Sequence, residues 1–145
     1  MVHANIETVF IADDDRITLT AYTAGRAAEM PYNEKRPAVL VFPGGGYSFC
    51  SDREGDPIAA SFIAAGYNVF VLEYSTERTT QRRFPNQLIE AALSMKFIRD
   101  NAEKYAVDPK RIFVIGFSAG AHLAGCLGIM YSSKYVTDNI DMPEN

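Results

Sequence analysis

Apolar runs alternate with amphipathic stretches along most of the chain, and their spacing predicts an α/β fold. Runs rich in β-branched and aromatic residues at 38–42, 68–74 and 111–115 have the length of strands that are buried on both faces. Between them, one helical stretch ends near Gly66 and a longer one opens at Pro85. Strands that alternate with helices along a chain pair in parallel, which predicts a sheet with helices on its faces.

The N-terminal residues add a β-hairpin in front of these units. Residues 5–12 and 16–22 are β-rich and alternate loosely, and an acidic turn at 13–15 separates them. The three aspartates of the turn also suit a cation, but an acidic turn is the favoured interpretation. The predicted fold class is therefore α/β, a mostly parallel sheet with flanking helices and an N-terminal antiparallel hairpin, in a single domain over residues 1–145. On the second strand, the face expected to meet the core carries Ile17, Leu19 and Ala21.

Local signals set the expected helix boundaries. Residues 51–54 have the form of a capping box, and Asp-Pro at 56–57 offers a competing start one turn later. A third helix is expected over 119–131, and residues 132–145 are expected to form a polar tail without periodicity. The helix after Pro85 has apolar residues at helical spacing that are expected to face the core, namely Leu88, Ala91, Ala92, Met95, Ile98 and Ala102.

The candidate chemistry lies where the last apolar run ends. Gly116, Ser118 and Gly120 form a Gly-x-Ser-x-Gly motif between the predicted strand, whose start is marked by the Asp-Pro turn at 108–109, and a helix of small residues. In a nucleophile elbow, such a turn holds the serine in a strained backbone conformation with its Oγ exposed. The motif arises by chance in roughly one in twenty chains of this length. Its position at a strand-to-helix junction favours a nucleophile over an idle serine.

A second glycine-rich segment supports the same interpretation and leads to a resemblance. The segments Phe-Pro-Gly-Gly-Gly-Tyr at 42–47, Asp-Pro-Lys-Arg-Ile at 108–112 and Gly-Phe-Ser-Ala-Gly-Ala-His-Leu-Ala at 116–124 stand in this order. With these motifs the chain resembles the α/β-hydrolase superfamily, most closely the acetyl esterase and hormone-sensitive-lipase-like branch that includes bacterial acetyl-xylan esterases. Pro43 departs from the commoner His-Gly-Gly-Gly form of the loop, and Ala121 stands where this branch often has glycine.

The resemblance implies a serine carboxylic-ester hydrolase that acts on small acyl groups, such as acetyl groups on sugars. Ser118 would be the nucleophile, and the backbone N–H groups of Gly45, Gly46 and Ala119 would stabilise the oxyanion of the tetrahedral intermediate. The expected partner is thus a small-molecule ester, and no cofactor or metal is expected. The alternative is a non-catalytic α/β-hydrolase-like scaffold or binding protein.

The chain departs from the family pattern after the nucleophilic serine. Family members carry an Asp or Glu and then a His on loops after later strands, whereas the residues after Ser118 contain no further predicted strand. The chain is therefore expected to correspond to the N-terminal half of a family member, without its acid and base. Loss of the catalytic histidine costs about 10⁶ in rate, against about 10²–10³ for one oxyanion donor, so we expect weak activity from the chain alone.

This departure raises two further expectations. His122 is the one histidine after the serine, and residues i and i+4 share a helix face, so a role as general base for Ser118 is one alternative. A packed, family-typical histidine is favoured, because the elbow directs Ser118 outward. The strand before Ser118 is expected to lie at an exposed sheet edge, through which the chain self-associates unless it belongs to a longer polypeptide.

Composition narrows the setting. The chain is 48% hydrophobic and 22% charged, which is typical of globular proteins. A net charge of −4 without a basic cluster argues against a nucleic-acid partner. Cys50 and Cys126 have no disulfide or metal-site spacing, which favours a reducing compartment. No secretory signal or apolar stretch long enough for a membrane span is recognised, so a soluble cytoplasmic protein is expected.

Overall fold

The computed structural model describes residues 4–31 and 34–141. The strands within these residues are β1 (Asn5–Ala12), β2 (Asp14–Thr23), β3 (Arg36–Phe42), β4 (Asn68–Glu73) and β5 (Val107–Gly116). The helices there are the short 3-10 helix η2 (Asp52–Glu54), α1 (Asp56–Ala64), α2 (Asn86–Asp100), α3 (Ala119–Met130) and α4 (Lys134–Thr137). In this part of the chain no helix has the length and apolar character needed to cross a lipid bilayer.

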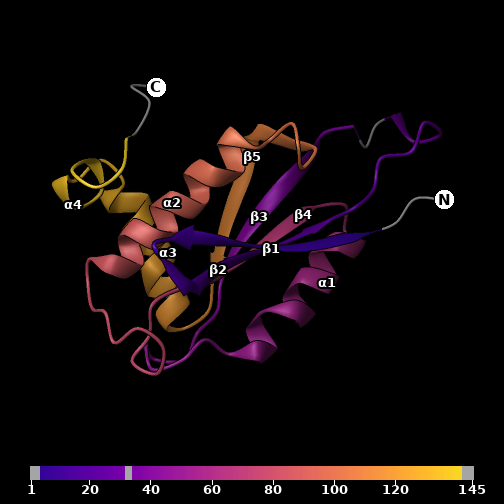
Figure 1. The fold of residues 1–145 in the computed structure, drawn as a ribbon. Helices are drawn as coiled ribbons and strands as arrows, with labels where there is room; N and C mark the ends of the chain where they lie inside the picture. The colour runs from indigo at the N-terminus through magenta and orange to yellow at the C-terminus, as the bar shows by residue number, and fades with distance from the viewer. Residues whose placement is uncertain (1–3, 32–33, 142–145) are drawn as a thin grey trace.

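The described strands form one sheet with the order β1-β2-β4-β3-β5 (Figure 1). β3 pairs in parallel with both β4 and β5, whereas β2 pairs antiparallel with β1 and β4. The expected α/β fold and hairpin are confirmed, but the sheet is mixed rather than mostly parallel because the hairpin joins it through β2. The carboxyl ends of the parallel strands meet at one edge, where the loops that follow β3 and β5 lie side by side.

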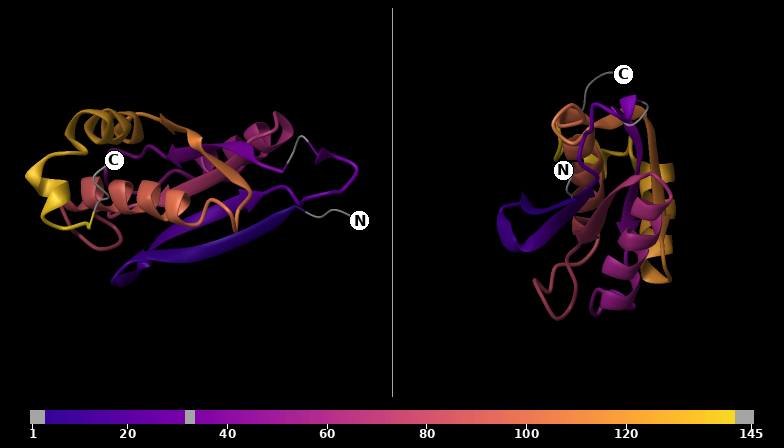
Figure 2. Two further views of the ribbon diagram at one scale, coloured as in Figure 1. Left: turned by 90° about the horizontal axis from the view of Figure 1, so that it is seen from above. Right: turned by 90° about the vertical axis from the view of Figure 1, so that its right-hand side faces the viewer.

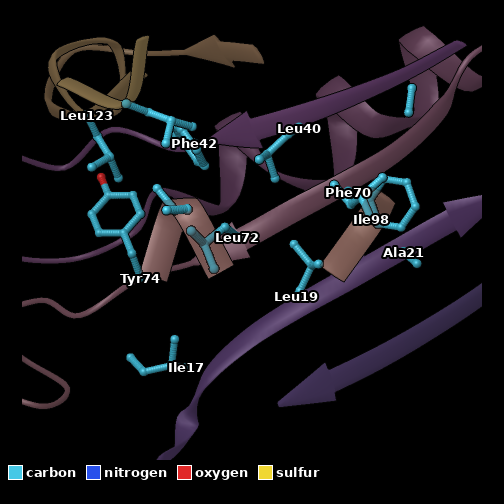
Figure 3. Close-up of a cluster of buried hydrophobic side chains, with 14 of the residues drawn as sticks. Ile17, Leu19, Ala21, Leu40, Phe42, Phe70, Leu72, Tyr74, Ile98 and Leu123 are labelled. Carbon is cyan, nitrogen blue, oxygen red and sulfur yellow. The ribbon is translucent and has the colours of Figure 1, made fainter. Parts of the chain in front are cut away.

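The two faces of the sheet carry separate hydrophobic clusters. Leu40 and Phe42 enter the larger cluster, which joins the sheet to α2, α3 and α4; Figure 3 shows part of it around Tyr74. Val39 and Val41 point to the opposite face, where α1 covers them. Each helix therefore packs on a sheet face that alternate residues of the same strands provide.

The hairpin forms one side of the sheet and β5 the other, as Figure 2 shows. Ile17, Leu19 and Ala21 of β2 are buried in the larger cluster, which confirms the face expected from the sequence. On β5, by contrast, the Phe113 side chain is 54% exposed, so the expectation of burial on both faces is wrong. The reason is position: among the described residues no strand pairs with the outer edge of β5, as expected for this strand. Whether the chain self-associates there stays a prediction.

Two expected boundaries differ in the structure. The strand expected to start after the Asp-Pro turn begins earlier, at Val107, and its pairing with β3 shifts register between Arg36 and Ala38. The Asp108 carboxylate accepts hydrogen bonds from the Lys110 backbone N–H (3.0 Å) and the Arg111 Nε–H (2.7 Å). The turn chemistry is therefore present, but it forms an irregularity inside the strand rather than its start.

The capping box expected at 51–54 is not formed. Ser51 makes no side-chain cap bond, and α1 begins at Asp56 with Pro57 in its first turn, which is the competing start. The Glu54 carboxylate accepts a hydrogen bond from the loop after β3 instead. Of the apolar residues expected on the long helix, Met95 is half-buried and the others are buried, although Ala102 lies just beyond the end of α2.

The expectation of a polar tail is wrong for residues 134–141, and residues 142–145 lie outside the described part. Here α4 forms, and Val136 and Ile140 are buried in the larger cluster. Their i, i+4 spacing places both side chains on one face, and α4 packs against α2. Two apolar residues in a polar stretch are thus sufficient to dock this segment.

A buried carboxylate fixes the loop that follows β4. Glu90 of α2 accepts hydrogen bonds from the Ser75 backbone N–H (2.7 Å) and from the Ser75 hydroxyl. Gln87, one turn earlier, donates to the backbone carbonyls of Ser75 (2.9 Å) and Arg82 (2.8 Å). Burial raises the pKa of Glu90, against the lowering effect of the Ser75 hydrogen bonds. The loop is therefore held by side chains of α2 rather than by strand pairing.

The first turn of α3 lies unusually close to β3. A Cβ at Gly120 would meet the Phe42 carbonyl oxygen at 1.9 Å, a distance that no side chain can occupy. At Gly125, further along the same helix, a Cβ would meet nothing within 4 Å. Gly120 is therefore required by packing, whereas Gly125 is not.

Replacing Glu90 tests the buried network. Glu90→Ala leaves the Ser75 donors buried without an acceptor and should lower the free energy of unfolding by about 1–3 kcal/mol. Glu90→Gln keeps one acceptor and should change it by less than about 1 kcal/mol. Because the pKa of Glu90 is raised above the ordinary 4.5, wild-type stability should fall relative to Glu90→Gln as the pH rises through the raised pKa. Urea denaturation from pH 4 upward measures both effects, and equal losses for the two variants would contradict this account.

Replacing the two glycines of α3 separates packing from helix propensity. Gly120→Ala should destabilise the fold by about 1–3 kcal/mol or more, because the added methyl overlaps the β3 backbone. Gly125→Ala should stabilise it by about 0.5–1 kcal/mol, because alanine loses less backbone entropy in an exposed helical position. Thermal or chemical denaturation of both variants is the measurement. Similar changes for the two variants would show that the close approach at Gly120 does not constrain the fold.

Candidate active site

Ser118 lies at the sharp turn between β5 and α3. Its backbone has φ 51° and ψ −115°, a left-handed conformation that costs a non-glycine residue about 1–3 kcal/mol. The Phe117 N–H donates to the Phe42 carbonyl (3.1 Å), and the Gly120 N–H donates to the Phe117 carbonyl (2.8 Å). These bonds and the close packing of Gly120 hold the turn, and Ser118 is exposed above it.

The glycine loop after β3 lies beside this serine. A Cβ at Gly44 would stand 3.1 Å from the Ser118 Cβ, so the two segments are in direct contact. Gly45 has φ 134°, and a Cβ there would meet the Phe49 carbonyl oxygen at 2.0 Å. The structure thus brings together the two glycine-rich segments that the sequence singled out.

Two side chains that the sequence did not assign to the site hold this loop. The Glu54 carboxylate accepts a hydrogen bond from the Gly44 backbone N–H at 2.7 Å. The Tyr74 hydroxyl donates to the Pro43 carbonyl at 2.5 Å. No sequence signal pointed to either contact, because each partner comes from a different segment of the chain.

The backbone donors expected near Ser118 are free within the described part of the chain. No acceptor there takes a hydrogen bond from the N–H groups of Gly45 or Gly46. Ala119 is the first residue of α3, where N–H groups have no partner inside the helix. Gly44, whose N–H is engaged by Glu54, was not among the expected donors. The geometry is thus compatible with an anion-stabilising site beside Ser118.

His122 lies one turn into α3 and is bonded away from the serine side chain. Its backbone N–H donates to the Ser118 carbonyl (3.1 Å), but its ring Nδ1 is 2.8 Å from the Tyr47 hydroxyl. The other ring nitrogen, Nε2, is 3.7 Å from the Cys126 Sγ. These contacts agree with the favoured interpretation of a packed histidine. The alternative role as general base stays a prediction.

A cavity of about 650 Å³ opens next to these residues. Its walls come from the loop after β3 (Gly46 and Tyr47), from the segment between β4 and α2, and from one face of α3. Ser118 does not line the cavity itself, but His122 does. The sequence predicted only a polar loop after β4 and gave no indication that it encloses a cavity.

The wall between β4 and α2 is also tied to the hairpin. The Arg16 guanidinium donates to the Thr79 carbonyl (2.7 Å), and both Arg16 and Arg82 pair with the Asp14 carboxylate (2.8 and 3.5 Å). The hydrogen bonds from Arg16 lower the pKa of Asp14 to about 2. The acidic turn is thus part of an ion-pair network, and the described residues contain no group of acidic, histidine or cysteine side chains arranged to hold a metal.

Comparison with known proteins places this geometry in a family. The BD-FAE family profile matches residues 28–145. Endo-1,4-beta-xylanase B of Butyrivibrio fibrisolvens is 42% identical over 106 residues, which cover 72% of this chain and 16% of that protein. An acetylxylan esterase of Xylanibacter ruminicola is 27% identical over 124 residues, which cover 85% of this chain and 24% of that protein.

The fold has the same relatives. The crystal structure of MGS-M1, an α/β hydrolase enzyme from a Medee basin deep-sea metagenome library, matches with a TM-score of 0.81 and 48% identity. The match covers 86% of this chain and 50% of that one, so the chain spans about half the length of this relative. It spans a quarter or less of the xylanase and the acetylxylan esterase. The chain belongs to the BD-FAE family, in the esterase branch of the α/β-hydrolases.

Proposed function

We propose that this chain supplies the nucleophile and the oxyanion-binding loop of a serine carboxylic-ester hydrolase. The observation that carries the proposal is the left-handed backbone of Ser118, which lies at a strand-to-helix turn directly beside a loop with free N–H groups. Strain of this kind persists where the surroundings impose it, and it clusters at active sites.

In the proposed reaction, the Ser118 Oγ attacks the ester carbonyl and a general base takes its proton. The carbonyl oxygen becomes an oxyanion, to which the N–H groups of Gly45, Gly46 and Ala119 donate. Collapse of the intermediate expels the alcohol and leaves an acyl-serine, which water then hydrolyses. Each donor of this kind contributes about 10²–10³ in rate.

The base and the acid are proposed to come from residues outside the described part of the chain. The His122 ring is engaged by Tyr47 and Cys126, so it is poorly placed to accept the Ser118 proton. In this family the acid and the histidine follow later strands. The strained serine and its donors are therefore one part of a complete site.

The proposed substrates are esters of small acyl groups, with acetylated sugars as the leading class. Support comes from the relative named an acetylxylan esterase and from the cavity beside the site. Gln81, Gln87 and Arg82 in its wall are polar groups of the kind that bind sugar hydroxyls. The proposed partner is thus a small molecule rather than a macromolecule.

Hydrolysis of p-nitrophenyl acetate by the 145-residue chain and its Ser118→Ala variant tests the proposal. We expect hydrolysis by the wild type, with acetylation of Ser118 detected by mass spectrometry, and loss of both in Ser118→Ala. The size of the loss reports on the base, because serine and histidine act as a unit. It approaches about 10⁶-fold where a base reaches Ser118, and it is small where none does.

Ser132→Ala is the matched control, since Ser132 is an exposed serine just after α3 and away from the glycine loop. It should behave as the wild type, and circular dichroism should show the same fold for all three proteins. Equal hydrolysis by wild type and Ser118→Ala, without acetylated Ser118, would refute the proposal for this chain. That outcome would favour the second candidate, a non-catalytic scaffold, which the bonding of His122 away from Ser118 also supports.

A further inference from the structure

We propose that Cys126 is a nucleophilic thiol, activated by His122, which small soft electrophiles alkylate inside the cavity. The proposal concerns a covalent modification site and does not depend on ester hydrolysis. It rests on a cluster of three side chains, those of Cys126, His122 and Tyr47, that the proposed esterase chemistry does not use.

The cluster is set by helix geometry. His122 and Cys126 are four residues apart on α3, so their side chains lie on one face, one turn from each other. The Cys126 Sγ is 3.7 Å from the His122 Nε2, within hydrogen-bonding distance for sulfur. Both side chains line the cavity, and Cys126 is partly exposed. An electrophile in the cavity therefore has access to the thiol.

Tyr47 completes the pair from the opposite wall. Its hydroxyl is 2.8 Å from the His122 Nδ1, and its ring packs edge-on against the imidazole with centroids 5.9 Å apart. Burial raises the pKa of Tyr47 to about 12, so the hydroxyl stays protonated at neutral pH. When Nδ1 carries its proton and donates to the Tyr47 oxygen, Nε2 is free to accept the thiol proton.

Proton transfer then gives a stabilised ion pair. The imidazolium has Tyr47 as acceptor at Nδ1 and the Cys126 thiolate as acceptor at Nε2. A thiolate beside a protonated histidine is the reactive form of cysteine, and such pairing lowers a thiol pKa. The other charged groups that line the cavity are Arg82 and Arg83, which favour the thiolate, and Glu77, which opposes it.

The proposed step balances without a further reagent. The Cys126 sulfur forms a bond to the electrophilic carbon of an alkyl halide or haloamide, and the carbon–halogen bond breaks with its electron pair leaving on the halide. The thiol proton passes to the His122 Nε2 and then to water. The product is a thioether that projects into the cavity.

Cys50 provides an internal control in the same chain. Its thiol donates a weak hydrogen bond to the Tyr74 carbonyl at 3.9 Å, and it does not line this cavity. Burial raises the pKa of Cys50 to about 12, so hardly any thiolate forms at neutral pH. The two cysteines therefore differ in the two properties that determine alkylation rate, thiolate fraction and access.

The test is alkylation of the folded chain by iodoacetamide, followed at each cysteine by mass spectrometry between about pH 5 and 9. Cys126 should react at least about tenfold faster than Cys50 at neutral pH. His122→Gln should slow Cys126 by about tenfold or more, since one unit of thiol pKa changes the thiolate fraction tenfold. Tyr47→Phe, which keeps the ring but removes the hydroxyl, should give a smaller decrease. Cys50 should react equally in all proteins.

Equal rates at the two cysteines would overturn the proposal, as would a Cys126 rate unchanged by His122→Gln. Circular dichroism and the unchanged Cys50 rate establish that a variant is folded. If His122→Gln unfolds, the pH profile of Cys126 in the wild type decides. A midpoint at or above the ordinary thiol value of about 8.5 refutes activation, and a lower midpoint supports it. Ester hydrolysis enters none of these measurements, so their failure would leave the proposed function untouched.

Discussion

The contact between the first turn of α3 and the end of β3 is the constraint on which the site depends. Gly120 lies against the Phe42 carbonyl, so the chain has only Phe117 and Ser118 in which to turn from strand to helix. That short turn imposes a left-handed backbone on Ser118 and leaves its side chain exposed above the sheet. The exposure of the serine is thus a result of backbone packing two residues away.

Carboxylates then hold the loops that surround this turn. Glu54 accepts from the Gly44 N–H in the loop after β3, and Glu90 accepts from Ser75 in the loop after β4. Both loops leave the sheet where strand pairing ends, so their backbone groups need other partners. A carboxylate with two acceptor oxygens satisfies several donors at once, which gives an irregular segment one conformation.

The sequence predicted those features that repeat along the chain or that demand glycine. The hairpin, the buried strands, α2 and α3 follow from apolar spacing, and the turn at Ser118 follows from Gly116 and Gly120. The capping box failed because the partner of Glu54 is Gly44, in the preceding loop. The cavity was missed because its walls come from three segments whose proximity depends on the folded sheet. α4 was missed because its docking rests on two apolar residues in a polar stretch.

The wall between β4 and α2 has a different relation to the sheet from that of the serine turn. It is held by side chains, with Arg16 and Asp14 on one side and Glu90 on the other, whereas backbone contact fixes Ser118. Substitutions in this wall can therefore reshape the cavity while the turn keeps its geometry. Within the family, such a division allows ligand preference to diverge by changes in one loop, without loss of the reactive serine's conformation.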